Sequence, residues 1–243
     1  EVLDGMQTVL FEPRLLLGLT LMTLVAGAFH EIGHASAARY GGARPGAMGA
    51  GVYIVWPVFY TDVSDTYRLD RRGRLRTDLG GVYFNVLFTL GTAAAFAATS
   101  FTPLLVLAVV VQLETLRQFL PFIRLDGYHV MSDLAGVPNL FAYMGPVLTV
   151  LVRRRDSEAL TVARHKLAEL TPRARTLIVG WVLVTAPVLA VNVVLFAIFL
   201  PRLAGMAWGS AAYQVEEMTT STGAITPVGL ANGAISLILL ALP

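Results

Sequence analysis

Four long apolar stretches constrain this chain more than any other feature of its sequence. They cover about 15–38, 79–99, 103–122 and 176–200, and each supplies the roughly 20 residues that a helix needs to cross a bilayer. Hydrophobic residues make up 56% of the 243 residues and charged residues only 14%, against roughly 45–50% and about 25% in an ordinary soluble domain. We therefore expect an all-α polytopic membrane protein.

Two further apolar stretches fit a membrane span less well. The stretch 223–242 is a candidate fifth span that Pro and Gly residues interrupt, and 139–152 is shorter than a span and runs into three arginines. We expect the latter to be a helix at the membrane interface. The expected organisation is an N-terminal flank (1–14), a transmembrane core (15–137), an interfacial helix with a basic cytoplasmic segment (138–175) and C-terminal transmembrane helices (176–243).

Basic residues predict how the spans are oriented. Fifteen Lys and Arg residues lie in the loops after the first and third spans, and only two lie on the opposite side. Because cytoplasmic loops carry the excess of Lys and Arg, we expect both loops in the cytoplasm. The excess of arginine over lysine favours a bacterial source, so the predicted location is the bacterial cytoplasmic (inner) membrane. The basic residues form no continuous face, so the lipid bilayer is an expected partner and nucleic acid is not.

The segment 52–60 interrupts the helical pattern. It is rich in β-branched and aromatic residues and is bounded by Gly49 and Gly51 before it and Asp62 after it, which indicates a strand or one arm of a hairpin. Pro57 favours an edge strand because proline has no N–H to donate. We expect a small β-hairpin or re-entrant strand near the cytoplasmic face, where protein or water covers its backbone.

A His-Glu-Ile-Gly-His motif at residues 30–34 ends the first apolar stretch. On a helix His30 and His34 share a face and could bind one zinc ion, with Glu31 beside them to activate water. The alternative is a polar helix end with hydrogen-bonded histidines. Ionisable groups at membrane depth are costly and mark functional sites, so the position of the motif favours metal binding.

A hydrolytic zinc site needs a third protein ligand. The chain has no cysteine, so that ligand must be a carboxylate or an imidazole. Glu114 lies within the third apolar stretch, where Arg117 is positioned to pair with it. Asp126 follows Pro121 and precedes Gly127 at the same predicted depth as His34, and its alternative role is to cap the next helix. His129 competes with Asp126 because it would share a helical face with it.

These motifs resemble the site-2 protease family of intramembrane zinc metalloproteases. The family pairs a membrane-embedded His-Glu-x-x-His with a later Leu-Asp-Gly that a proline precedes, and Pro121 and Asp126 keep that spacing. The run 80–85, which ends in Asn85, looks like a variant of the family's Gly-Pro-x-x-Asn element without its proline. Gln118 stands where asparagine is usual. Within the family, the runs 60–65 and 121–128 look like bacterial members described as peptide zinc metalloproteases.

The resemblance implies zinc as the cofactor, with His30, His34 and Asp126 as metal ligands and Glu31 as the catalytic base. It also implies a catalytic role for Asn85, with an interhelical hydrogen bond as the alternative. The expected activity is hydrolysis of peptide bonds in a single-span membrane protein or a membrane-docked peptide, at an active site towards the cytoplasm. Two rival readings are a catalytically silent relative that binds or escorts peptides, and a transporter with an incidental metal site.

Overall fold

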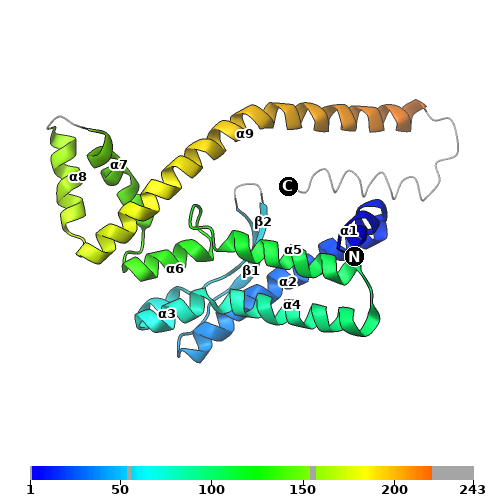
Figure 1. The fold of residues 1–243 in the computed structure, drawn as a ribbon, viewed down its shortest axis with the longest axis horizontal. Helices are drawn as coiled ribbons and strands as arrows, with labels where there is room; N and C mark the ends of the chain where they lie inside the picture. The colour runs from blue at the N-terminus through cyan, green and yellow to red at the C-terminus, as the bar shows by residue number, and fades with distance from the viewer. Residues whose placement is uncertain (1, 54–55, 154–156, 221–243) are drawn as a thin grey trace.

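The computed structural model describes residues 2–53, 56–153 and 157–220, and most of them are helical (Figure 1). Residues within the N-terminal third of the chain form a two-stranded antiparallel sheet. In chain order the elements are α1 (Val2–Phe11), α2 (Pro13–Tyr40), β1 (Met48–Tyr53), β2 (Trp56–Thr61), a 3-10 helix (Ser64–Arg68), α3 (Arg71–Asp78), α4 (Gly80–Thr99), α5 (Pro103–Gln118), α6 (Asp126–Ala135), a second 3-10 helix (Leu140–Tyr143), α7 (Met144–Val152), α8 (Glu158–Ala168) and α9 (Pro172–Thr220).

Local sequence signals explain where several helices begin and end. Pro13 and Pro103 open α2 and α5, positions at which the missing N–H of proline has no intrahelical partner to lose. Asp70 and Ser157 cap α3 and α8 by accepting hydrogen bonds from backbone N–H groups, which satisfies donors that the helices leave free. Gly136 ends α6 in the left-handed region at φ 69°, where glycine avoids the steric cost that other residues meet.

Helices α2, α4 and α5 lie side by side and form the part of the molecule that carries the motif (Figure 1). The backbones of α2 and α4 touch where Gly33 meets Gly80: a Cβ at Gly33 would lie 2.4 Å from the Gly80 carbonyl oxygen, and one at Gly80 would lie 2.5 Å from that of Gly33. Any side chain at either position would push the helices apart. Gly33, inside the motif, therefore has a packing role: it lets α4 approach α2 closely.

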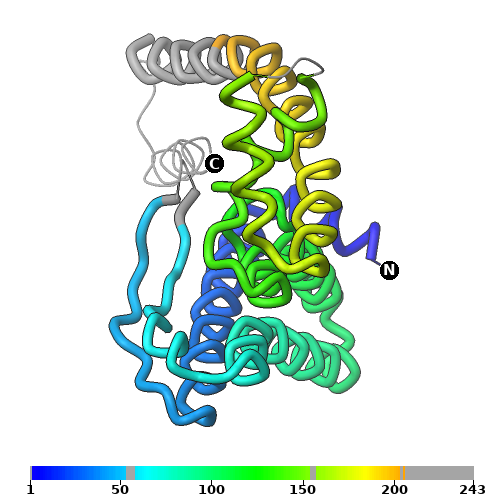
Figure 2. The backbone as a smooth tube through the Cα atoms, turned by 90° about the vertical axis from the view of Figure 1, so that its left-hand side faces the viewer, coloured from blue at the N-terminus to red at the C-terminus, as the bar shows by residue number. Residues whose placement is uncertain are grey.

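The hairpin expected near the motif is present. Its register pairs Met48 with Thr61 at one end and Tyr53 with Trp56 at the other. The segment 52–60 was expected as a single strand or arm, whereas the chain turns back within it. Residues 54 and 55 of that segment lie outside the described part of the chain. Figure 2 shows the two strands beside the helices at one edge of the molecule.

The structure supports membrane spans, with changes to their expected bounds. Among the residues that the structure describes, three helical segments are long and apolar enough to cross a bilayer: Pro13–Tyr40, Arg71–Thr99 and Pro172–Arg202. The expected third span, 103–122, is shorter, because α5 ends at Gln118 after 16 residues and the chain turns at Pro121. The stretch 139–152, expected at the interface, joins α6 as a pair bent by 62°, which has the length and composition of a broken span or a re-entrant loop. The candidate fifth span, 223–242, lies outside the described residues.

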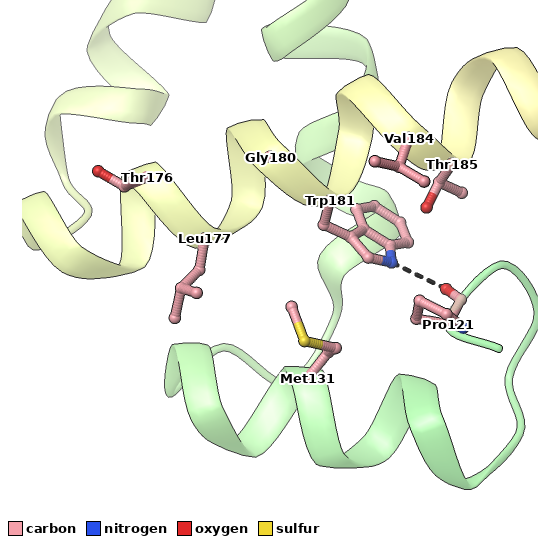
Figure 3. A pocket seen from close by; sticks show the side chains of 8 residues that line it. All are labelled: Pro121, Met131, Thr176, Leu177, Gly180, Trp181, Val184 and Thr185. Carbon is pink, nitrogen blue, oxygen red and sulfur yellow. Dashed lines mark hydrogen bonds between the residues drawn. The ribbon is translucent and has the colours of Figure 1, made fainter. Parts of the chain in front are cut away.

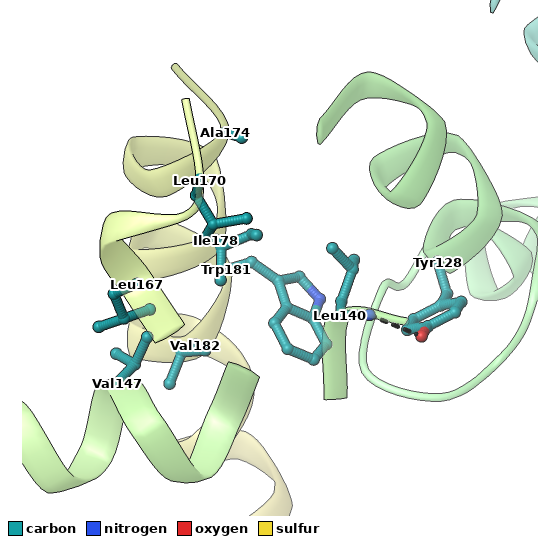
Figure 4. Packing of buried hydrophobic residues seen from close by; sticks show 9 residues of the cluster. All are labelled: Tyr128, Leu140, Val147, Leu167, Leu170, Ala174, Ile178, Trp181 and Val182. Atoms are coloured by element: carbon teal, nitrogen blue, oxygen red, sulfur yellow. Dashed lines mark hydrogen bonds between the residues drawn. The ribbon is translucent and has the colours of Figure 1, made fainter. Parts of the chain in front are cut away.

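An apolar cluster joins α6 to the C-terminal helices (Figure 4). It joins residues on both sides of the boundary expected near 137, and Tyr128 lies at its α6 side with 2% of its surface exposed. The Tyr128 hydroxyl accepts a hydrogen bond from the Leu140 N–H at 3.0 Å. The buried members of the cluster are Tyr128, Leu140, Val147, Leu167, Leu170, Ala174, Ile178, Trp181 and Val182.

Candidate metal centre

The two histidines of the motif lie together on one face of α2, as the i, i+4 spacing requires. Their Nε2 atoms are 3.0 Å apart. The side chains are almost fully buried, with 3% of His30 and 8% of His34 exposed. Two imidazole nitrogens at this distance need a proton or a cation between them, so the pair could share a hydrogen bond or hold a metal ion.

The carboxylate of Asp126 completes the cluster from the first turn of α6. Its Oδ2 lies 3.1 Å from His30 Nε2 and its Oδ1 lies 3.4 Å from His34 Nε2. Leu125, not Asp126, is the N-cap residue of α6, and no side chain caps this helix. Asp126 therefore faces the histidines and does not cap α6, which was its alternative role.

The spacing of these three side chains fits a tetrahedral zinc ion. Ligand atoms about 2.0–2.1 Å from such an ion lie roughly 3.3–3.4 Å from one another. The distances here are close to that: 3.0 Å between the two Nε2 atoms, and 3.1 and 3.4 Å from these nitrogens to the carboxylate oxygens. Asp126 Oδ2 is buried and lies 3.1 Å from His30 Nε2, without the geometry of a hydrogen bond. A cation held between these atoms would satisfy the buried oxygen.

Gly81, in the first turn of α4, leaves open the space next to both imidazoles. A Cβ at this position would lie 2.3 Å from His30 Cε1, 2.4 Å from His30 Nε2 and 2.6 Å from His34 Nε2. These distances are far inside normal contact, so no side chain fits there. The sequence drew attention to the run 80–85 but not to this role of Gly81.

Helix α3 orients the cluster through backbone and side-chain contacts that the sequence analysis missed. His34 Nδ1 donates a hydrogen bond to the Thr77 carbonyl at 2.8 Å, which leaves Nε2 as the lone-pair nitrogen that a metal requires. On the same helix, the Arg74 Nε donates a hydrogen bond to Asp133 Oδ1 of α6 at 2.8 Å. The same short helix thus holds one histidine and the helix that carries Asp126.

Glu31 is half-buried and accompanies the two histidines. One ligand atom from each of His30, Glu31 and His34 lies within 4.8 Å of the others, and this group could hold a metal ion. Its backbone carbonyl accepts a hydrogen bond from the Thr61 hydroxyl of β2 at 3.1 Å. The hairpin is therefore hydrogen-bonded to the motif itself. The bond uses only the backbone of Glu31, so the Glu31 carboxylate can still act beside the imidazoles.

The structure gives the other candidates from the sequence different contacts. Glu114 pairs with Arg117 on α5 at 2.6 Å, the same-helix ion pair that was its alternative role. His129 is exposed on α6, and its ring lies edge-on to Tyr128. The Asn85 side-chain amide donates to the Thr115 hydroxyl of α5 at 2.9 Å, the interhelical hydrogen bond that was its alternative. Its catalytic role stays a prediction.

The function of this chain has to be inferred from the geometry of this centre, because comparisons with known proteins contribute no evidence. The chain was compared with protein-family models, with curated proteins and with solved structures, and no match was found.

Proposed function

We propose that this protein is a membrane-embedded zinc metalloprotease of the site-2 protease type, which cleaves a membrane-spanning or membrane-docked peptide. The observation that carries the proposal is the convergence of Asp126 on His30 and His34, from a helix 92 to 96 residues further along the chain. Two imidazoles and a carboxylate form the ligand set of many hydrolytic zinc sites. Of the expected ligand candidates, only these three meet in the described structure.

Zinc held by these three side chains would supply Lewis acidity that activates water near neutral pH and polarises the scissile carbonyl. Glu31 would act as the general base: its carboxylate takes a proton from water and then gives it to the nitrogen of the leaving amine. Metal binding alone does not require Glu31, because Asp126 supplies the carboxylate ligand. The presence of both carboxylates favours a hydrolase over a silent peptide-binding relative.

The hairpin offers a way to present an extended substrate. A helical peptide protects its own amide groups by hydrogen bonding, so it must unwind before cleavage. Strand addition to an edge of the hairpin would hold an unwound segment through main-chain hydrogen bonds. Phe59 packs against α2 at Gly27, and Thr61 bonds to the carbonyl of Glu31, so β2 is fixed close to the proposed base.

The test compares the full wild-type chain with Glu31→Gln, both purified from membranes. We expect about one zinc per chain in each by elemental analysis, because Glu31 is the base and not a ligand. In cells that depend on the wild-type chain, Glu31→Gln should cause an uncleaved membrane peptide to accumulate, and mass spectrometry of the membrane fraction would identify it. Zinc-free wild-type protein would exclude the metal centre. Zinc in both proteins, with identical peptides in both membranes, would favour the silent relative.

A further inference from the structure

Trp181 of α9 joins the C-terminal helices to the segment that carries Asp126. It is buried, with 4% of its surface exposed, and its indole Nε1 donates a hydrogen bond to the Pro121 carbonyl at 2.8 Å (Figure 3). Its ring also packs edge-on against Tyr128, with centroids 6.2 Å apart, and against Phe141 at 5.1 Å. One side chain therefore contacts residues on both sides of Asp126.

The segment between α5 and α6 has little regular structure of its own. Helix α5 ends at Gln118 and α6 begins at Asp126, so the chain crosses this interval in turns. It folds tightly, because a Cβ at Gly127 would lie 2.2 Å from the Phe119 carbonyl oxygen. A tight turn with few internal hydrogen bonds depends on outside contacts for its position, and the Pro121 carbonyl receives such a contact from Trp181.

Packing and the hydrogen bond act together at this contact. Trp181 packs in the apolar cluster on one side, and on the other it borders a pocket of about 330 Å³ lined by Pro121, Met131 and residues of α9 (Figure 3). The hydrogen bond is the directional part of the contact, so it sets how the turn is placed against α9. The bond is part-buried, and a carbonyl shielded from water is less stable without a donor, so the bond also holds Pro121 in place.

We infer that Trp181 is a positioning residue for the metal centre: its N–H fixes the turn that sets the Asp126 carboxylate against the two histidines. This inference rests on the proposed function, and it gives the C-terminal region a role in the centre. Partners that orient metal ligands typically change affinity about 10–100-fold when they are removed. Trp181 acts through the backbone of the turn, so we expect a change of about tenfold, at the lower end of that range.

The test uses Trp181→Phe, which keeps an aromatic ring in the apolar cluster but has no N–H. The full chain is loaded with Zn²⁺ in competition with a chromophoric chelator, and with Co²⁺ for its visible absorption spectrum. For Trp181→Phe we expect about tenfold weaker Zn²⁺ binding and a shifted Co²⁺ spectrum. Trp181→Ala should be less stable than Trp181→Phe but should bind metal no more weakly. A general loss of stability would not shift the spectrum of the molecules that remain folded.

Asn192→Leu is the matched control, because it removes another 2.8 Å hydrogen bond to a backbone carbonyl on α9, at an exposed position. This variant should bind both metals as the wild type does. Wild-type affinity and an unchanged Co²⁺ spectrum in Trp181→Phe would overturn the inference while leaving the proposed function intact. Failure of the wild-type chain itself to bind either metal would instead overturn the proposed function.

Discussion

Replacing Gly81 with alanine should damage the metal centre by steric contact alone. The added methyl group would lie 2.3–2.6 Å from three imidazole atoms of His30 and His34. Non-bonded carbon and nitrogen atoms normally stay at least about 3.4 Å apart, so the imidazoles or α4 would have to move by about 1 Å. Functional sites tolerate misplacements of only about 0.5 Å.

We therefore expect Gly81→Ala to lower Zn²⁺ affinity by about 10–100-fold and any peptidase rate by about 100-fold. Zinc content after dialysis and chelator competition measure the first effect. The matched control is Gly91→Ala on the same helix, where a Cβ would meet nothing within 4 Å. That control should keep full zinc affinity and gain up to about 1 kcal/mol from the better helix propensity of alanine.

The reasoning would be refuted by Gly81→Ala protein that binds zinc as tightly as Gly91→Ala protein. That result would mean that the space beside Gly81 has no connection to the metal position. Loss of folding in Gly81→Ala, measured by the thermal unfolding midpoint, is distinguishable from loss of zinc affinity in a folded chain. Gly81→Ser offers a second variant that must meet the same contact.

Three further predictions follow from contacts described above. Asp126→Asn should lose most of its bound zinc in elemental analysis, whereas His129→Gln should keep it, and the reverse result would transfer the ligand role to His129. Arg74→Ala breaks a half-buried ion pair between α3 and α6 and should lower the free energy of unfolding by about 2 kcal/mol. Its control, Arg117→Ala, breaks an exposed pair and should lower it by less than about 1 kcal/mol. Equal losses of stability in thermal unfolding would contradict the role of α3. A cysteine in place of Ser64 should be protected from an impermeant thiol reagent in intact cells and labelled after lysis, and labelling of intact cells would reverse the predicted topology.

The sequence predicts those parts of the structure that depend on neighbouring residues. Two histidines four residues apart share a helix face in any helix, so their meeting required no knowledge of the fold. The hairpin was predicted from the β-prone residues in 52–60, although its turn was not. Asp126 was favoured over His129 by resemblance, by the charge of a carboxylate and by the expectation that Gly127 would interrupt the helix. That last expectation was wrong, because α6 runs from Asp126 to Ala135 through Gly127, yet the Asp126 carboxylate lies against the histidines and His129 is exposed.

Contacts between distant parts of the chain were not predicted. The Thr77 carbonyl meets His34 across 43 residues, and Trp181 meets Pro121 across 60 residues. Neither pair has a local pattern, because a backbone carbonyl is present at every residue and a tryptophan in an apolar helix is typical of lipid-facing or buried positions alike. The short α5 was missed for a similar reason: apolar residues continue to Phe122, whereas the helix ends where the chain turns towards α6.

The backbone contact between Gly33 and Gly80 limits how this molecule can move. At this contact the main chains of the two helices already touch, so α2 and the start of α4 cannot move closer together beside the histidines. In the protease proposed above, an extended peptide would need space close to Glu31, on the side of α2 that faces the hairpin. The hairpin is attached there through side-chain contacts of Phe59 and Thr61, which a smaller motion can open than the backbone contact with α4.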